Sequence, residues 1–308
     1  MKKSLFALLH ATRVTRFAAW WNRRRAIFLC YHGVTERPSR SPEDTKGLHV
    51  NHRRFVAQLD FLERRYHVIS LREYLQANRD GRSLPDYSAV LTFDDGFRNF
   101  FTVAAPLLAA RAMPATVYLI TDKAGEESDI NLSRKWTPED DRRYLSWTEA
   151  RLLKQEQDVE FGSHTCSHSG LLTLSPAETE RELLHSYRNL ITHLAVEAPT
   201  LSYPKGQYSR MLADDARALG YACAVTTDRG PNELNHDLFT LGRALIGDDD
   251  DEASFAVRVS GLRWWLVKVR ELLVWRTTSE PQRVEAPVSG NEPGFELLEK
   301  QSTTPIWR

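Results

Sequence analysis

Short apolar runs alternate along the chain with segments whose apolar residues recur at helical spacing. The apolar runs are rich in β-branched and aromatic residues, as buried strands are. They occupy residues 26–31, 67–71, 89–93, 115–120, 158–162, 200–203 and 221–226. The segments with helical spacing occupy residues 52–65, 71–77, 99–112, 146–154, 176–195 and 209–219. This alternation of strand and helix predicts a parallel α/β sheet or barrel.

Residues 1–25 have a different pattern, because every charged residue in them is basic. These residues are Lys2, Lys3, Arg13, Arg16, Arg23, Arg24 and Arg25. The apolar run after Lys3 is interrupted by His10 and Arg13, and no small-residue cleavage site follows, so we interpret residues 1–25 as a basic amphipathic helix and not as a secretory signal. The candidates for its apolar side are Leu5, Leu8, Leu9, Val14, Phe17 and Trp21. Such a helix can lie on an anionic membrane surface or dock on the protein itself, and the sequence favours neither.

The other end of the chain contains two further segments. Residues 262–276 are rich in tryptophan, and their apolar positions nearly encircle a helix that either packs on the barrel or contacts a membrane or partner. Residues 277–308 are rich in Pro, Ser and Glu and are expected to be disordered. We therefore predict one folded domain over residues 26–261, between helical extensions. Within it, residues 122–143 are polar and aperiodic, which indicates a loop over a binding site or a surface insertion.

Charge and cysteine content exclude several classes of protein. Lys plus Arg and Asp plus Glu number 41 each among 308 residues, so no net charge attracts the chain as a whole to nucleic acid. The cysteines Cys30, Cys166 and Cys223 are odd in number and far apart, which argues against a secreted fold built on disulfides. No apolar run reaches the about 18 residues that a membrane-spanning helix needs.

Two motifs about seventy residues apart carry the candidate chemistry: Thr92-Phe-Asp-Asp-Gly96 and His164-Thr-Cys-Ser-His168. Each follows a predicted strand, and α/β folds bind their ligands at the carboxyl ends of strands. One carboxylate with two imidazoles suits a divalent transition metal with open positions for water and substrate. The second carboxylate is then available as a general base. Paired aspartates alone indicate a helix cap or a solvated turn, whereas both motifs at successive strand ends favour a metal site.

These motifs resemble those of the polysaccharide deacetylase family, also called the NodB-homology family or carbohydrate esterase family four. A third family motif resembles Ser202-Tyr-Pro-Lys-Gly206, and the similarity covers residues 27 to 261 approximately. The resemblance implies a distorted, incomplete (β/α) barrel that hydrolyses an acetamide with the help of a metal. It also implies a set of roles, in which the metal ligands are Asp95, His164 and His168, the general base is Asp94, and the oxyanion lies at Tyr203 and Pro204. Zinc is the expected metal, with cobalt or nickel as alternatives.

The sequence departs from the family pattern at two positions. Many members take their general acid from a histidine in a Leu-x-Leu-His motif, which this chain lacks. In the branch of poly-N-acetylglucosamine deacetylases a Tyr-His pair supplies the acid, and Tyr31-His32 resembles it; we therefore predict His32 as the acid and His236 as the second candidate. The family arginine that orients the base is replaced by Ser202, and Arg243 is the candidate that takes over its role.

The prediction is thus an N-deacetylase that releases acetate from an N-acetylated sugar of a bacterial exopolysaccharide or its precursor. Its partners would be a glycan or a lipid-linked oligosaccharide, with peripheral membrane contact through the terminal helices and no nucleic acid. We expect it in the cytoplasm, at the inner face of the membrane, and periplasmic export stays open. Two alternatives remain: a related metal hydrolase of a non-sugar amide, and a non-catalytic glycan-binding or assembly protein with a decayed site.

Overall fold

The computed structural model of the chain describes residues 2–37, 47–125, 135–157, 159–227, 230–267 and 269. The chain divides into two units, Met1–Lys268 and Val269–Arg308, and every element named below belongs to the first. Of the predicted C-terminal helix, residues 262–267 and 269 are helical. The rest of that helix and the predicted tail lie outside the described residues. In the described ranges, no helix combines the length and the apolar character needed to cross a bilayer.

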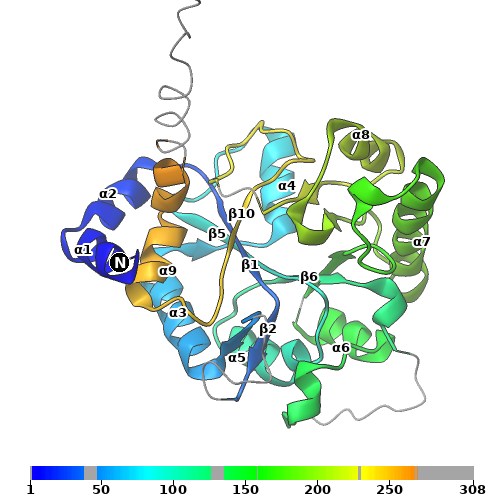
Figure 1. The fold of residues 1–308 in the computed structure, drawn as a ribbon, viewed down its shortest axis with the longest axis horizontal. Helices are drawn as coiled ribbons and strands as arrows, with labels where there is room; N and C mark the ends of the chain where they lie inside the picture. Colours follow the sequence, from blue (N-terminus) through cyan, green and yellow to red (C-terminus); the bar gives the residue numbers. More distant parts are fainter. Residues whose placement is uncertain are drawn as a thin grey trace, which may run out of the picture. The chain divides into compact units, whose positions relative to one another are not determined.

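The first unit is built on a parallel sheet of eight strands (Figure 1). Its strand order is β10-β1-β5-β6-β7-β8-β9, with β4 paired to β5 as well. The bounds are β1 Ile27–Tyr31, β4 His67–Val68, β5 Ser88–Phe93, β6 Thr116–Leu119, β7 Glu160–Ser163, β8 Leu201–Ser202, β9 Ala224–Val225 and β10 Arg243–Leu245. A parallel bridge joins Val225 to Leu241, just before β10, so the sheet curls into a nearly closed barrel. The predicted distorted (β/α) barrel is confirmed.

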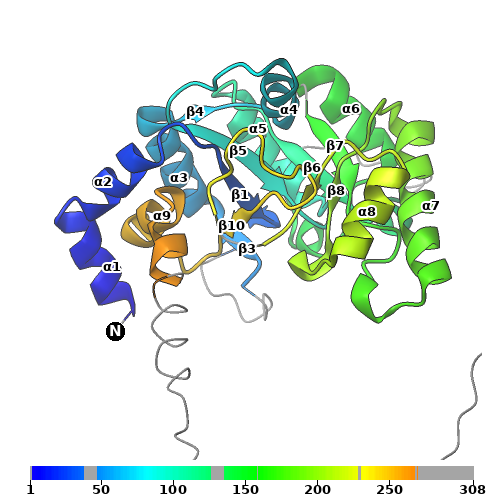
Figure 2. The ribbon, with the colours of Figure 1, turned by 90° about the horizontal axis from the view of Figure 1, so that it is seen from above.

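Helices connect most of the strands and cover the outside of the barrel (Figure 2). They are α3 His52–Arg65, α4 Leu71–Asp80, α5 Ala105–Ala109, α6 Trp147–Gln157, α7 Pro176–Leu194, α8 Arg210–Ala218 and α9 Glu252–Val259. Six of them begin at a side chain that accepts a hydrogen bond from a first-turn N–H, which fixes where each helix starts. These caps are Asn51, Ser70, Ser146, Ser175, Ser209 and Asp251. The predicted helix 99–112 is instead a π-helical turn, Phe100–Ala104, followed by the short α5.

The central strands β1 and β5 are buried along their whole length, because both of their faces are covered. Their outward side chains, such as Leu29 and Leu91, pack into the cluster beneath α3 and α5. Their inward side chains, such as Phe28 and Val90, meet Tyr118 of β6 in the barrel interior. The interior is therefore a packed core that supports the carboxyl ends of the strands.

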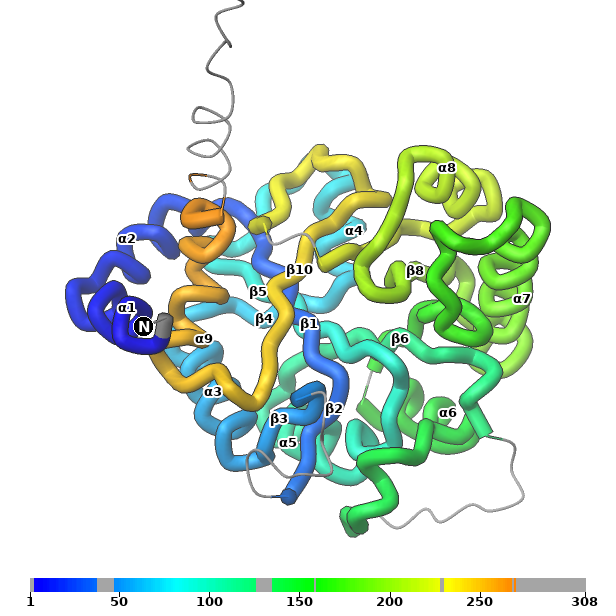
Figure 3. Tube along the Cα trace, viewed as in Figure 1, coloured from blue at the N-terminus to red at the C-terminus, as the bar shows by residue number. Residues whose placement is uncertain are grey.

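Two segments that the sequence presents as polar loops have structure. The strands β2, Gly33–Thr35, and β3, His49–Asn51, form a second, two-stranded parallel sheet (Figure 3). The predicted loop 122–143 contains the 3₁₀ helices η2, Thr121–Lys123, and η4, Pro138–Asp141, while residues 126–134 lie outside the described ranges. Asp140 and Asp141 of η4 are buried, and Asp140 accepts from Arg98 Nη1 at 2.5 Å. Arg98 Nε donates also to Glu149 of α6 at 2.8 Å, so ion pairs and not apolar periodicity hold this segment.

Residues 1–25 contain two helices and not the single one predicted, α1 Lys2–Ala11 and α2 Val14–Trp21. The break lies at Arg13, whose φ of 63° places it in the left-handed region that interrupts a helix. Both helices pack against α9, as the blue and orange helices show (Figure 2). The sequence left open whether these helices dock on the protein itself or on a membrane. One side of each helix docks on the protein itself.

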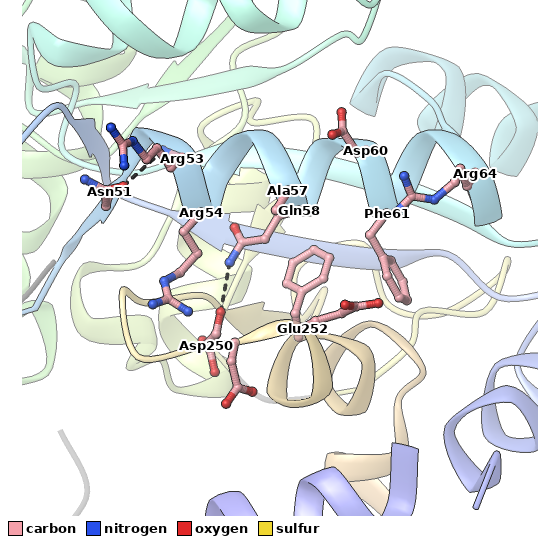
Figure 4. A pocket seen from close by; sticks show the side chains of 12 residues that line it. Asn51, Arg53, Arg54, Ala57, Gln58, Asp60, Phe61, Arg64, Asp250 and Glu252 are labelled. Carbon is pink, nitrogen blue, oxygen red and sulfur yellow. Dashed lines mark hydrogen bonds between the residues drawn. The ribbon is translucent and has the colours of Figure 1, made fainter. Parts of the chain in front are cut away.

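The end of β1 is held by α3 and by the segment before α9. The Tyr31 hydroxyl donates to Gln58 Oε1 at 3.1 Å, and Gln58 Nε2 donates to the carbonyl of Asp250 at 3.4 Å (Figure 4). Gln58 and Asp250 border a groove of about 480 Å³ between α3 and α9. Because Tyr31 directly precedes His32, the same bonds fix the strand end on which that histidine lies.

Candidate metal centre and active site

The predicted ligands lie together at the carboxyl ends of β5 and β7. The His164 Nε2 atom is 3.5 Å from Asp95 Oδ1, and the His168 Nε2 atom is 3.7 Å from the same oxygen. The three ligand atoms all lie within 4.8 Å of one another. Asp95 and His164 are buried, whereas His168 is partly exposed. The structure thus brings together three residues that the chain separates by up to 73 positions.

The distances fit a small tetrahedral ion. Nitrogen and oxygen ligands of zinc lie at about 2.0–2.2 Å from the metal, which puts two of them about 3.4 Å apart. His164 Nδ1 donates to the carbonyl of Ser202 at 2.8 Å, so its Nε2 lone pair faces the other ligands. Burial lowers the pKa of His164 and of His168, and each imidazole is accordingly neutral, as metal binding requires.

The backbone at this site is held in a conformation that most residues avoid. Asp95, Thr165 and His168 have φ of 70°, 66° and 65°. A left-handed residue other than glycine costs about 1–2 kcal/mol, so surrounding bonds must enforce it. In the turn after β7 the N–H of His168 donates to Thr165 Oγ1, and Glu182 of α7 accepts from the N–H groups of residues 166 and 167. Strain of this kind is concentrated at functional sites, where it fixes the direction of the side chains.

The second aspartate is paired with a fully buried arginine. Arg243 Nη1 donates to Asp94 Oδ1 at 2.6 Å, and Nη2 donates to Oδ2 at 2.7 Å. The remaining N–H groups of Arg243 donate to Thr92 Oγ1, Ser202 Oγ and the carbonyl of Thr226, so all five donors are satisfied. Burial raises the pKa of Asp94, but the charge and the hydrogen bonds of Arg243 outweigh it and hold this pKa well below its usual range. The arginine proposed from the sequence therefore contacts the predicted base.

Two further side chains on Asp94 were not predicted. Ser202 Oγ and Cys30 Sγ both donate to Asp94 Oδ2, at 3.2 Å and 3.4 Å. Strand periodicity could have identified Cys30. Cys30 of β1 and Thr92 of β5 are partners in the register, and both side chains point into the barrel on the side of Asp94. Ser202 was identified only as the position where the family arginine is missing.

His32 directly follows β1 and lies within electrostatic range of Asp94, Asp95 and His164. Burial lowers the pKa of His32, and the two aspartates oppose this effect. Its Nδ1 atom is buried, with no hydrogen-bond partner in the described part of the chain. The second candidate acid, His236, is exposed and its Nε2 atom bonds to Thr240 at 3.1 Å.

The third motif, near which the oxyanion is expected, starts at the end of β8. The Tyr203 hydroxyl donates to the carbonyl of Phe239, and the Tyr203 N–H donates to Val225 in the sheet, at 3.2 Å each. Pro204 has no N–H. The next N–H along the chain belongs to Lys205, which has a φ of 59° and whose charge acts on His168. Lys205 is thus the first residue of this motif with an N–H outside the sheet.

An aromatic pair lies at the edge of the ligand set. The rings of Phe97 and Tyr144 stack with centroids 5.2 Å apart, and both side chains are half-buried. The segment of Tyr144 runs antiparallel to the residues after Asp95, since Leu145 N donates to the carbonyl of Gly96 at 2.8 Å. Burial and, after it, the charge of Asp95 raise the pKa of Tyr144, in agreement with a position beside the ligands. This stacked, half-buried pair offers apolar surface to a molecule bound beside the ligands.

Comparison with known proteins identifies what this arrangement is similar to. The polysaccharide deacetylase family model matches residues 81–224. The chain is 24% identical over 267 residues to the poly-beta-1,6-N-acetyl-D-glucosamine N-deacetylase of Escherichia coli (strain K12), covering 78% of this chain but only 39% of that enzyme. It is 24% identical over 218 residues to the enzyme of the same name from Staphylococcus aureus (strain MSSA476), covering 68% and 71% of the two chains.

The fold has solved relatives as well. The Streptococcus pyogenes deacetylase PplD, in complex with acetate, superposes with a TM-score of 0.64 at 26% sequence identity. The match covers 76% of this chain and 98% of that one. The barrel described above is therefore the fold of a known deacetylase.

Proposed function

The chain belongs to the polysaccharide deacetylase family, whose enzymes hydrolyse the C–N bond of an acetamide, and from this premise we propose that it is a metal-dependent N-deacetylase of an N-acetylated glycan. One observation carries the proposal. Asp95, His164 and His168 lie within 4.8 Å of one another, beside a second carboxylate that Arg243 holds in place.

Asp95, His164 and His168 would hold the ion, with zinc as the expected metal and cobalt or nickel as alternatives. When bound, the metal polarises the acetamide carbonyl and lowers the pKa of a water molecule. The fit of the site to such an ion rests on the neutral imidazoles and on the ligand distances of 3.5 Å and 3.7 Å.

Asp94 would act as the general base that accepts a proton from the attacking water. Its low pKa keeps it ionised at neutral pH, and the two bonds from Arg243 fix the orientation of its carboxylate. Fixed orientation matters because a base contributes only when it lies within hydrogen-bonding distance of the proton that it removes. The N–H of Lys205 is our candidate donor to the oxyanion, since Tyr203 donates within the sheet.

His32 would donate the proton that the departing amine needs. Its ring lies beside the same two aspartates, and its buried Nδ1 makes no bond among the described residues, so a proton there could be passed to substrate. His32→Ala should lower kcat by about 100-fold or more while the metal content stays at one ion per chain. Unchanged kcat would remove His32 from the mechanism.

The substrate that we propose is a β-1,6-linked N-acetylglucosamine polymer or its lipid-linked precursor. The support is the name of the two relatives, at 24% identity each. The site of action that we propose is the cytoplasmic face of the membrane, where a lipid-linked oligosaccharide would be encountered.

Acetate release from β-1,6-linked N-acetylglucosamine oligomers, measured before chelation, after chelation and after addition of zinc, tests the function. We expect activity that chelation abolishes and zinc restores, and that Asp94→Asn removes. Asp214→Asn, on the exposed surface of α8, is the matched control and should keep full activity. Metal binding without acetate release from any acetylated glycan would point to a non-sugar amide as substrate. Absence of bound metal would support the non-catalytic alternative.

A further inference from the structure

The outer side of α2 carries large aromatic residues and arginines together. Phe17, Trp20 and Trp21 are 62%, 48% and 58% exposed. Their spacing of three and four residues places them on one face of the helix. Basic residues on the same face or at the ends of the helix are exposed as well. We call the aromatic and basic residues together the α2 face, which consists of Arg13, Arg16, Phe17, Trp20, Trp21 and Arg24.

The opposite side of α2, which makes the protein contact, is small and polar. Thr15 and Ala18 are buried against the α9 region, and Asn22 Nδ2 donates to the carbonyl of Ser260 at 2.9 Å. A helix that docks on a core normally buries its largest apolar residues and exposes its polar ones. In α2 this order is reversed, so the contact with α9 does not explain the aromatic residues.

The neighbouring helix adds to the apolar surface. Leu5 and Leu8 of α1 are 48% and 59% exposed and lie three residues apart. The helical residues 262–267 begin close to Ser260, which Asn22 at the end of α2 contacts. Within them, Trp265 and Leu266 are 40% exposed each. Exposed apolar side chains in such number on adjoining helices mark an interaction site.

Charge selects among the partners that an apolar face could bind. In the part of the chain that the structure describes, no carboxylate forms an ion pair with Arg13, Arg16 or Arg24. The carboxylates near these helices pair with other basic residues: Asp249 with Lys3, Asp86 with Arg23, and Glu233 with Arg25. Arg16 also borders a groove of about 310 Å³ together with Arg65 and Tyr87, which is large enough for a phosphate-bearing headgroup.

We propose that the α2 face, with Leu5 and Leu8, lies on the surface of a bilayer that contains anionic lipid. Tryptophan and phenylalanine would enter the boundary between headgroups and acyl chains, and the arginines would contact lipid phosphates. The attachment is peripheral and reversible, and it turns the helix pair α1–α2 into a membrane anchor.

Sedimentation of the full chain with lipid vesicles tests the proposal. We expect binding to vesicles of phosphatidylcholine and phosphatidylglycerol in equal parts, weak binding to phosphatidylcholine alone, and loss of binding at high salt. The triple change Arg13→Gln, Arg16→Gln, Arg24→Gln should weaken binding by about 100-fold, because each basic residue near an anionic surface contributes about a factor of five. The triple change Phe17→Ser, Trp20→Ser, Trp21→Ser should weaken it at least as much.

A surface variant elsewhere provides the control. Leu172 and Met211 are 50% and 69% exposed outside the terminal helices, and the double change Leu172→Ser, Met211→Ser should leave binding unchanged. All variants should keep wild-type acetate release from soluble oligomers, so failure of the anchor is separable from failure of the proposed function. Wild-type binding that is absent, or that persists in the aromatic variant, would overturn the proposal. So would self-association that the aromatic variant abolishes, since the face would then bind a second copy.

Discussion

Replacement of Arg243 by methionine tests whether the Asp94–Arg243 pair is held together as a buried charge pair. Arg243 is fully buried, and Asp94 is 3% exposed. Methionine keeps most of the volume of the arginine but donates no hydrogen bond, so Asp94 would remain in the barrel as a carboxylate without its partner. Breaking such a pair from one side costs about 3–5 kcal/mol of the free energy of unfolding.

Urea denaturation at pH 7 measures this loss, and a surface arginine supplies the control. Arg217 also donates to two carboxylates, those of Asp214 and Asp237, but its side chain is 46% exposed. Arg217→Met should therefore cost less than about 1 kcal/mol. The double variant Asp94→Asn, Arg243→Met leaves no charge behind in the barrel. We therefore expect its loss of unfolding free energy to be at least about 2 kcal/mol smaller than the sum of the losses in the two single variants.

The pH dependence distinguishes charge from packing. In the wild type the pKa of Asp94 lies below its unfolded value of about 3.9, so the pair stabilises the protein above that pH, and the stabilisation is lost as the pH falls through the folded pKa. Without Arg243, burial raises the pKa of Asp94, and its ionised form is costly at pH 7. The free energies of unfolding of the wild type and of Arg243→Met should therefore differ most at pH 7, and the difference should shrink below about pH 4. A loss of free energy under about 1 kcal/mol at pH 7, or a loss below pH 4 equal to that at pH 7, would refute the reasoning.

Three further changes test the rest of the site. His168→Ala should release bound metal on dialysis, and its urea midpoint should match that of the chelated wild type because the imidazole is partly exposed; metal analysis and denaturation of the same sample check both parts. Tyr144→Ala should raise KM for soluble oligomers by about tenfold with kcat nearly constant, while Tyr144→Phe keeps the ring and the wild-type KM; equal values for both variants would exclude a stacking role. Arg98→Met should destabilise the protein by about 3–5 kcal/mol, as it leaves Asp140 and Glu149 buried without their cation, and a loss below about 1 kcal/mol would contradict that view of the cluster.

Local pattern in the sequence predicts a parallel α/β sheet or barrel and the meeting of the two motifs, and the family resemblance narrows the fold to a barrel. Parallel strands end at the same edge, so residues that directly follow β5 and β7 had to lie near one another. The contact of Arg243 with Asp94 was harder to predict. Arg243 stands at the start of its strand, and only the length of its side chain lets it reach a residue at the end of β5.

The features that were missed depend on contacts distant in sequence. The parallel pairing of Gly33 with His49 has no hairpin turn to signal it. The burial of η4 depends on Arg98, about 40 residues earlier, and carries no apolar periodicity. The break at Arg13 lies inside a pattern that is helical on both sides, and arginine is an ordinary helix former. In each case a tertiary contact or a single backbone angle overrides local preference.

The distance along the chain between Asp94 and Arg243 has a consequence for biosynthesis. The two residues are 149 positions apart, and β10, which carries the arginine, is the last strand of the barrel to be made. Until the ribosome has released β10, any compact form of the preceding strands contains Asp94 without its partner, and burial of that carboxylate is strongly unfavourable. The aspartate thus delays closure of the barrel until the final strand arrives, and chains that end before residue 243 should be recognised as unfolded and degraded.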